Sequence, residues 1–176
     1  MNDHTSSTRS TNKRLIWLGI LAIAVVALDQ ISKAWIRGNL AVGETSDLWR
    51  GVVHLSHVHN YGAAWSILSG QRWLLVFVTV AVVGVVLSVA KSFVQKSAIG
   101  AWSVGLIVGG AIGNLIDRVS QGYVTDMIDV DTSWGFLRTF PVFNLADSAL
   151  TMGVFLMLWL SLLPEKTAKN ASEVAT

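Results

Sequence analysis

Four long apolar segments alternate with polar connections along the chain. They cover residues 15–36, 73–90, 97–116 and 145–163. A helix needs about 20 predominantly apolar residues to cross a bilayer, so the pattern predicts four transmembrane helices in one domain over 15–163. The first uncharged run, 15–28, is only 14 residues long, and its helix must therefore continue through Asp29 and Lys33.

The first apolar segment also has features of a cleavable signal peptide. It follows the basic pair Lys13 and Arg14 and contains small residues such as Ala22 and Ala24. The apolar run continues past those alanines and then carries charged residues, which favours a retained transmembrane helix.

The polar connections predict a small sheet outside the membrane. Residues 49–58 are rich in β-branched and aromatic side chains and partly alternate, which is typical of a strand. An open sheet edge is not tolerated in lipid, so we expect an extracytoplasmic β region over about 37–65. Residues 119–143 are expected to form an outer loop or short helix, and 91–96 a basic loop. The predicted fold class is a mainly α membrane protein.

Composition supports this fold class. The chain is 52% hydrophobic and 14% charged, whereas about a quarter of the residues in a soluble domain are charged. It contains no cysteine, which excludes disulfides, thiol catalysis and cysteine-ligated metals. A net charge of +2 is too small to suggest a nucleic-acid partner.

The distribution of basic residues predicts the orientation in the membrane. Four spans place both termini on one side, so the polar tails 1–14 and 164–176 share that side with the loop at 91–97. These three segments hold seven basic and three acidic residues, a net charge of +4, and the rest of the chain has a net charge of −2. Basic residues favour the cytoplasmic side, so both termini are expected in the cytoplasm and the connections 37–72 and 118–144 outside.

Polar residues at the outer ends of two spans are candidate functional residues, because ionisable groups in membrane segments are costly. Asp29 and Lys33 are four residues apart and share a helix face. They could contact a substrate, or form a structural ion pair with Lys33 extending toward the interface. Asn114, Asp117 and Arg118 also share one face, and could frame a site or form only a polar network at a helix end.

Acidic residues in the second outer connection suggest general acid–base chemistry. Asp126, Asp129 and Asp131 precede Asp147, which falls in the first turn of the fourth span. One of these acids could converge with Asp147, since the residues between them can close a loop. Two carboxyl groups that share a proton can take a proton from water and donate one to a carbonyl oxygen. Asp129 and Asp131 can equally be solvated loop acids, and this pattern alone does not choose among the three.

Three of the four histidines, His54, His57 and His59, lie within six residues. His57 and His59 are expected on one face of a strand. A zinc site is one interpretation, but no HExxH motif occurs and no third ligand is obviously spaced. We therefore favour exposed strand histidines and expect no metal site. The segment 60–65 that follows fits a glycine turn with interfacial aromatic residues.

Five short motifs occur in order along the chain: DQISK (29–33), NYGAAW (60–65), GGAIGNLIDR (109–118), VTDM (124–127) and FNLAD (143–147). With the four apolar segments, they resemble the signature blocks of lipoprotein signal peptidase, also called signal peptidase II. Each motif alone is weakly specific, but five in this order are highly specific. One departure is Met127, where the family usually has Phe.

The resemblance implies a four-helix aspartyl protease of the bacterial inner membrane that uses no cofactor or metal. Its substrate would be a prolipoprotein whose cysteine carries diacylglyceryl. Cleavage immediately before that cysteine would release the signal peptide. The resemblance also implies a monomer embedded in membrane lipid, and inhibition by cyclic peptide antibiotics such as globomycin.

The family's site residues can be assigned to this chain by their positions within the matching motifs. The resemblance implies that Asp126 and Asp147 are the catalytic pair, near the outer, periplasmic face. It also places the outer sheet within 37–65 and a mobile outer helix within 127–140. The residues implied to line or support the site are Asn60, Gly62, Asn114, Arg118, Asn144, Asp29, Lys33 and Asp117.

Two other classes of function fit part of the pattern. A small transporter or channel would line a path with the charged residues, but we find no internal repeat, and the charges gather at one surface. A structural scaffold would use the glycines only for helix packing. Neither class predicts cleavage of a peptide bond.

Overall fold

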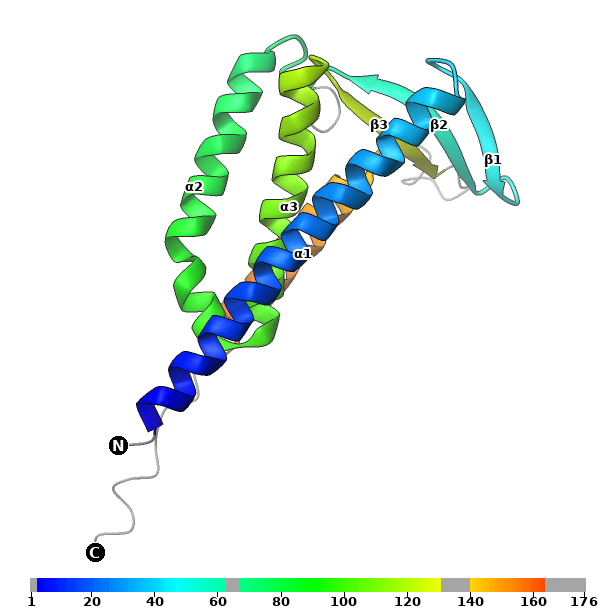
Figure 1. Cartoon of the computed structure of the whole chain (residues 1–176). Helices are drawn as coiled ribbons and strands as arrows, with labels where there is room; N and C mark the ends of the chain where they lie inside the picture. The colour runs from blue at the N-terminus through cyan, green and yellow to red at the C-terminus, as the bar shows by residue number, and fades with distance from the viewer. Residues whose placement is uncertain (1–2, 63–66, 131–139, 164–176) are drawn as a thin grey trace, which may run out of the picture.

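The computed structural model describes residues 3–62, 67–130 and 140–163. In these residues four long helices stand beside one another, and a three-stranded sheet lies at one end of them (Figure 1). The elements are α1 (Asp3–Asn39), β1 (Thr45–Trp49), β2 (Val53–Asn60), α2 (Arg72–Lys96), α3 (Ala98–Ser120), β3 (Val124–Val130) and α4 (Leu145–Leu162).

Each of the four helices is long and apolar enough to cross a membrane. The chain is therefore a mainly helical, multi-pass membrane protein, as the sequence predicts. Large apolar side chains on α1, α2 and α4 point away from the protein interior, among them Ile23, Phe77 and Phe155, which are 58–72% exposed. A lipid environment accounts for this exposure, since a soluble protein rarely exposes apolar patches of this extent.

Two helix boundaries differ from the sequence prediction. Helix α1 begins at Asp3, well before the predicted start at residue 15. The prediction of a basic loop at 91–96 is wrong, because these residues continue α2 to Lys96. They contain no glycine or proline that would end a helix. The turn into α3 is at Ser97, whose side chain caps α3 by accepting a hydrogen bond of 3.0 Å from the Gly100 amide.

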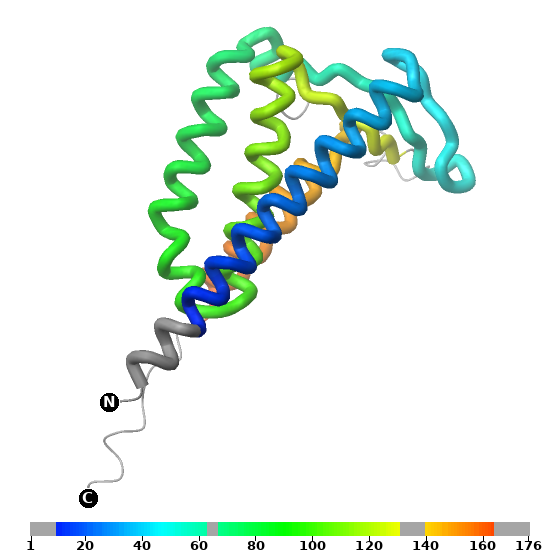
Figure 2. The backbone as a smooth tube through the Cα atoms, viewed as in Figure 1, coloured from blue at the N-terminus to red at the C-terminus, as the bar shows by residue number. Residues whose placement is uncertain are grey.

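Helix α3 is the central helix of the bundle. It packs against α1, α2 and α4, and the smooth backbone trace shows it between them (Figure 2). Glycines allow the close approach. A Cβ atom at Gly109 would lie 2.8 Å from the Ala22 carbonyl oxygen of α1, and one at Gly113 would lie 2.7 Å from Asp29 Oδ2. The glycines of α3 therefore bring the polar end of α1 against it.

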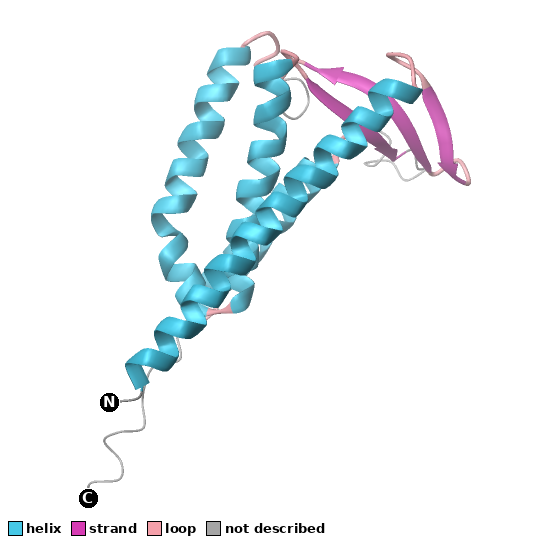
Figure 3. Cartoon of the chain, in the orientation of Figure 1, coloured by secondary structure: helices cyan, strands magenta, loops and turns pink. Residues whose placement is uncertain are grey.

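The sheet is antiparallel, in the order β1–β2–β3 (Figure 3). The strand predicted at 49–58 is present as β2, displaced by a few residues toward the C-terminus. Strand β3 corrects a second prediction, since residues 124–130 were expected in an outer loop or helix. Four of these residues, Val124, Thr125, Ile128 and Val130, are β-branched, which favours a strand. The rest of the predicted outer helix, 131–139, lies outside the described residues.

Phe143 connects the sheet to the start of α4. Its carbonyl oxygen accepts hydrogen bonds from the amides of Met127 (3.0 Å) and Ile128 (2.7 Å), and its own amide donates to the Ile128 carbonyl oxygen (3.0 Å). Met127, the departure from the family pattern, is buried. These bonds fix the position of β3 relative to the first turn of α4, which sets the geometry of the site.

Candidate functional site

Asp126 projects from β3 and is almost fully buried, with 2% of its surface exposed. Its register partner on β2 is Val58, two residues before Asn60. The Asn60 side-chain amide donates to Asp126 Oδ2 (2.9 Å), and the Asn144 side-chain amide donates to Oδ1 (2.7 Å). Both carboxyl oxygens therefore have a fixed amide partner.

Asp147 is the third residue of α4 and forms a capping box with Asn144. The Asn144 side-chain oxygen accepts a hydrogen bond from the Asp147 backbone amide (2.9 Å), and the Asn144 backbone amide donates to Asp147 Oδ2 (3.2 Å). The Asn114 side-chain amide donates to Asp147 Oδ1 (2.7 Å). A carboxylate at this position also suits the positive end of the helix dipole.

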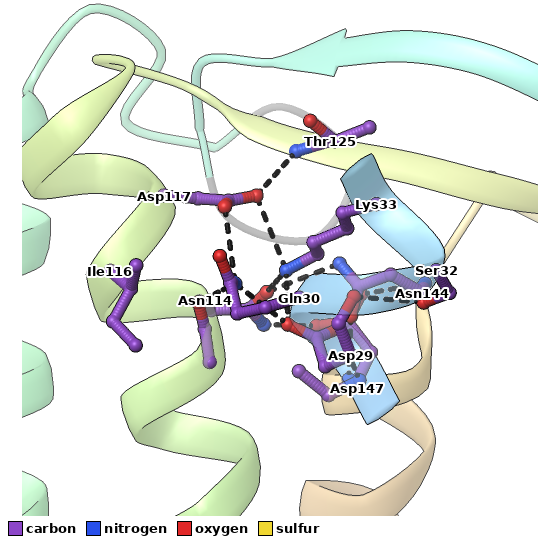
Figure 4. A network of polar contacts seen from close by, with 12 residues as sticks. Asp29, Gln30, Ser32, Lys33, Asn114, Ile116, Asp117, Thr125, Asn144 and Asp147 are labelled. Carbon is purple, nitrogen blue, oxygen red and sulfur yellow. Dashed lines mark hydrogen bonds and ion pairs between the residues drawn. The ribbon is translucent and has the colours of Figure 1, made fainter. Parts of the chain in front are cut away.

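Asn144 and Asn114 link the two carboxyl groups. The Asn144 side-chain amide that bonds Asp126 also donates to Asn114 Oδ1 (3.1 Å). Since Asn114 donates to Asp147, Asp126 and Asp147 belong to one hydrogen-bonded group. Asn114, Asn144 and Asp147 converge from α3 and the start of α4 (Figure 4).

Burial raises the pKa of Asp126 to about 7, and the neighbouring Asp147 carboxylate raises it in the same direction. The amides of Asn60 and Asn144 and the charge of Lys33 oppose this rise. Asp126 therefore exchanges its proton near neutral pH, as a general acid or base must.

Lys33 is fully buried beside the carboxyl pair. Its ammonium group lies 2.8 Å from Asp29 Oδ2 and 3.3 Å from Asp117 Oδ2, and donates to Asn114 Oδ1 at 2.9 Å. Figure 4 shows these side chains gathered between α1 and α3. The structural ion pair weighed from the sequence is confirmed, but Lys33 does not extend toward the interface. It holds the Asn114 carbonyl oxygen, so the Asn114 amide points to Asp147.

Three further residues complete this network and were not singled out from the sequence. The Gln30 side-chain amide donates to Asp117 Oδ1 (3.2 Å), and the Thr125 amide donates to Asp117 Oδ2 (3.0 Å). Arg37 donates to Thr125 Oγ1 (3.0 Å) and lies 3.7 Å from Asp117. A sequence signal was available for all three residues. Gln30 and Thr125 stand inside the recognised motifs, and Arg37 follows Lys33 by one helical turn.

Asp29 and the remaining predicted residues also lie in or beside the group. Asp29 Oδ1 accepts from the Ala146 amide (3.0 Å), which ties α1 to the first turn of α4. Arg118 donates to the Gly62 carbonyl oxygen (3.1 Å), and the Gly62 amide donates to Asn60 Oδ1 (2.9 Å). Gly62 therefore orients both Asn60 and Arg118.

A cavity of about 690 Å³ opens beside the carboxyl pair. Its polar side is formed by five of the predicted residues. Its apolar side is formed by the segment 140–143 and by α4 side chains such as Leu150, Met152 and Phe155. The five predicted residues are Asn60, Asn114, Arg118, Asp126 and Asp147, and Ser148 and Thr151 are further polar residues of the lining. The cavity is therefore lined by the two carboxyl groups on one side and by apolar side chains on the other.

The other weighed residues lie away from this cavity. Asp129 accepts a long hydrogen bond from Ser56 (3.4 Å). Asp131 lies outside the described residues. His57 is buried, not exposed as predicted, and its ring lies 5.1 Å from that of His59, which confirms that the two share a strand face. Among the described residues, no group of three His, Cys, Asp or Glu side chains could hold a metal ion.

The fold and the site define a multi-pass membrane protein with an acidic centre at one end of its helices. Residues 21–163 match the family model described as signal peptidase (SPase) II. The chain therefore belongs to the signal peptidase II family.

Relatives and solved structures agree with this family. The lipoprotein signal peptidase of Lactococcus lactis subsp. lactis (strain IL1403) is 40% identical over 160 residues, which cover 89% of this chain and 99% of the relative. That of Listeria monocytogenes serotype 4b (strain CLIP80459) is 40% identical over 139 residues, covering 79% and 88%. A solved structure described as a bacterial membrane enzyme is 33% identical, with a TM-score of 0.71 and coverage of 88% and 92%.

Proposed function

We propose that this protein removes the signal peptide from diacylglyceryl-modified prolipoproteins by an aspartyl mechanism. Membership of the signal peptidase II family makes it a peptidase that acts on prolipoproteins. The observation that carries the mechanism is the pair of linked carboxyl groups, Asp126 and Asp147, on one cavity. The proposed cleavage point is the peptide bond immediately before the lipidated cysteine.

Asp126 and Asp147 have different environments, which supports different roles. The raised pKa of Asp126, about 7, keeps a proton available near neutral pH. Asp147 accepts hydrogen bonds from the Asn114 side chain and the Asn144 backbone at a helix N-terminus, and these donors stabilise a negative charge. We assign Asp126 as the general acid and Asp147 as the general base.

The proposed reaction consists of two steps, and each step involves two proton transfers. Asp147 takes a proton from water, whose oxygen attacks the carbonyl carbon, while Asp126 gives its proton to the carbonyl oxygen. The tetrahedral intermediate then breaks its carbon–nitrogen bond as the cysteine nitrogen accepts the proton held by Asp147 and Asp126 recovers its own. The two carboxyl groups exchange all the protons of both steps, without a nucleophilic side chain or a cofactor.

The surrounding polar residues act as positioning residues in this proposal. Asn60 and Asn144 hold Asp126, and Asn114 holds Asp147. Arg118 lines the cavity and interacts electrostatically with both carboxyl groups. It is placed to orient the substrate peptide, and its contact with the Gly62 carbonyl oxygen fixes it there.

The apolar wall of the cavity supports a lipidated substrate. Leu150, Met152 and Phe155 extend along α4 from the carboxyl pair. The acyl chains and the signal-peptide helix can remain in lipid while the bond beside the cysteine reaches the acids. We place this end of the helices at the outer face of the inner membrane and both termini in the cytoplasm. A cyclic peptide antibiotic such as globomycin is expected to inhibit the monomeric enzyme.

A cleavage assay with purified protein in detergent tests the proposal. The wild type should convert a diacylglyceryl-modified precursor into a product that begins with the lipidated cysteine, and should leave the unmodified precursor intact. Asp126→Asn and Asp147→Asn should each lower the cleavage rate by at least about 100-fold, since general acid–base catalysis contributes roughly this much or more. Mass spectrometry of the product identifies the bond that is cut.

Asp129→Asn is the matched control, because Asp129 is on the same strand and does not line the cavity. Its rate should stay within about threefold of wild type, since changes away from a catalytic site are usually small. Processing by Asp126→Asn or Asp147→Asn at the wild-type rate would refute the mechanism. A channel or a scaffold would yield no shortened product at all.

A further inference from the structure

A second cavity, of about 350 Å³, lies at the opposite end of the helices from the carboxyl pair. It is formed between α1 and α3, where α1 passes the turn from α2 into α3 (Figure 1). Its lining residues are Arg14, Trp17, Ala98, Ala101 and Trp102. Ala98 and Ala101 contribute only small side chains to this lining.

Arg14 has unused hydrogen-bonding capacity at this cavity. Its Nη1 atom donates to the carbonyl oxygens of Val94 (3.1 Å) and Gln95 (2.9 Å), at the end of α2. These bonds hold the guanidinium group against the α2–α3 turn. A guanidinium has five N–H donors, and within the described part of the chain no hydrogen bond from Arg14 Nε or Nη2 is found. Those donors can serve a ligand.

The two tryptophans of the lining are of the residue type that is common at the depth of the lipid headgroups. Trp17 and Trp102 are 60% and 50% exposed on the outside of the bundle. Tryptophan near the end of a transmembrane helix usually lies at the membrane interface, with its ring between headgroups and acyl chains. The cavity therefore opens to the interfacial layer of one leaflet.

The charge around the cavity is positive. Lys13 and Lys91 lie on the same ends of α1 and α2 as Arg14 and the turn. The chain has no acidic residue between Asp3 and Asp29, or between Asp47 and Asp117. No carboxylate of these segments competes for Arg14, and a negative ligand is favoured.

We propose that this cavity binds the headgroup of an anionic phospholipid from the adjacent leaflet. The phosphodiester accepts hydrogen bonds from Arg14 Nε and Nη2, and the glycerol region packs between Trp17 and Trp102. Basic pockets between transmembrane helices commonly bind anionic lipid headgroups, and arginine suits the planar geometry of phosphate recognition. Through Arg14 the lipid joins α1 to the α2–α3 turn, independently of the peptidase reaction.

Native mass spectrometry of the full-length protein in detergent, titrated with phosphatidylglycerol or phosphatidylcholine, tests this site. The wild type should retain phosphatidylglycerol at least about fivefold more strongly than phosphatidylcholine. Arg14→Gln should lower the apparent affinity for phosphatidylglycerol by at least about fivefold, because it removes direct hydrogen bonds from a charged donor to the phosphodiester. Ala98→Phe should also lower it by filling the cavity while leaving the Arg14 side chain in place.

Lys13→Gln is the matched control, because it removes the same charge beside Arg14 and Lys13 does not line the cavity. It should change the affinity by less than about twofold, since an exposed charge acts weakly. The proposal is overturned if Lys13→Gln weakens binding as much as Arg14→Gln, or if Ala98→Phe binds phosphatidylglycerol like the wild type. Precursor cleavage by the same samples is a separate readout, which reports on the peptidase alone.

Discussion

Asp126 occupies a position in which its ionised form is disfavoured. Burial raises the pKa to about 7, from an ordinary value of 3.8. Between these values the folded protein holds a proton at this position that the unfolded chain releases. The free energy of unfolding therefore falls as the pH rises through this range, and the loss is complete above pH 7. The proposed function of this residue therefore opposes stability.

Asp126→Asn should consequently be more stable than the wild type at pH 8, although the proposed mechanism predicts that it is inactive. The neutral amide removes the buried charge, so the melting temperature in detergent should rise by at least about 2 °C. At pH 4.5 the gain should shrink, because Asp126 is then protonated in the wild type. A gain of equal size at both pH values would contradict the electrostatic explanation. Asp129→Asn, outside the cavity, serves as the reference for a simple loss of charge.

Lys33 is a second buried residue, and its ammonium group is paired with two carboxylates. Lys33→Met should destabilise the protein by about 3–5 kcal/mol, because it leaves Asp29 and Asp117 without their shared buried cation. Thermal unfolding in detergent measures this loss. The double variant Asp29→Asn, Lys33→Met removes one of the stranded charges and should recover part of the stability. A double variant less stable than Lys33→Met would contradict this account.

At the scale of elements, the contact between α1 and α3 depends on the absence of a side chain at Gly109. Gly109→Val should destabilise by about 1–3 kcal/mol through steric overlap with Ala22. Gly84→Val is the matched control on α2, since a Cβ atom there would meet nothing within 4 Å. Thermal unfolding of the two variants makes the comparison. Equal melting temperatures would show that α1 adjusts to the extra volume.

The sequence predicts the helices better than the strands for a physical reason. An apolar segment of membrane length has few alternatives, because its backbone must satisfy its own hydrogen bonds in lipid. Strand β3 was missed because its pairing partner β2 lies about 70 residues away in the chain. Polar and apolar residues do not alternate in 124–130, so its β-branched side chains were the one local signal for a strand. The loop predicted at 91–96 was wrong because charge marked a membrane boundary and not a helix end.

The residues of the candidate site likewise divide into those that the sequence indicates and those that only the structure reveals. Asp126, Asp147 and the asparagines were found because they stand in motifs with a family resemblance. Arg37 and Thr125 were not singled out. Arg37 is 88 residues from Thr125, and the end of α3 lies between Thr125 and their partner Asp117, so only folding brings the three together. Pattern alone left Asp126, Asp129 and Asp131 equivalent. The structure separates Asp126 from Asp129, because Asp126 lines the cavity whereas Asp129 contacts Ser56 and does not line it.

At the scale of the whole molecule, the acidic centre and the basic cavity lie at opposite ends of the helices. This polarity predicts the orientation of the protein in the membrane. Since the chain has no cysteine, Ser46→Cys in β1 and Gln95→Cys near the α2–α3 turn are single reporters at exposed positions. A membrane-impermeant maleimide applied to spheroplasts should label Ser46→Cys directly. Gln95→Cys should react only after permeabilisation, and the reverse pattern would invert the proposed topology.

The hydrogen bonds between Phe143 and β3 have a consequence for how this protein diversifies. They fasten the chain on both sides of the segment that separates the two acids, so the distance between Asp126 and Asp147 does not depend on that segment's length. Insertions, deletions or whole exchanges there leave the acid–base geometry intact. The length of this segment can therefore differ among relatives while the arrangement of the two acids stays the same.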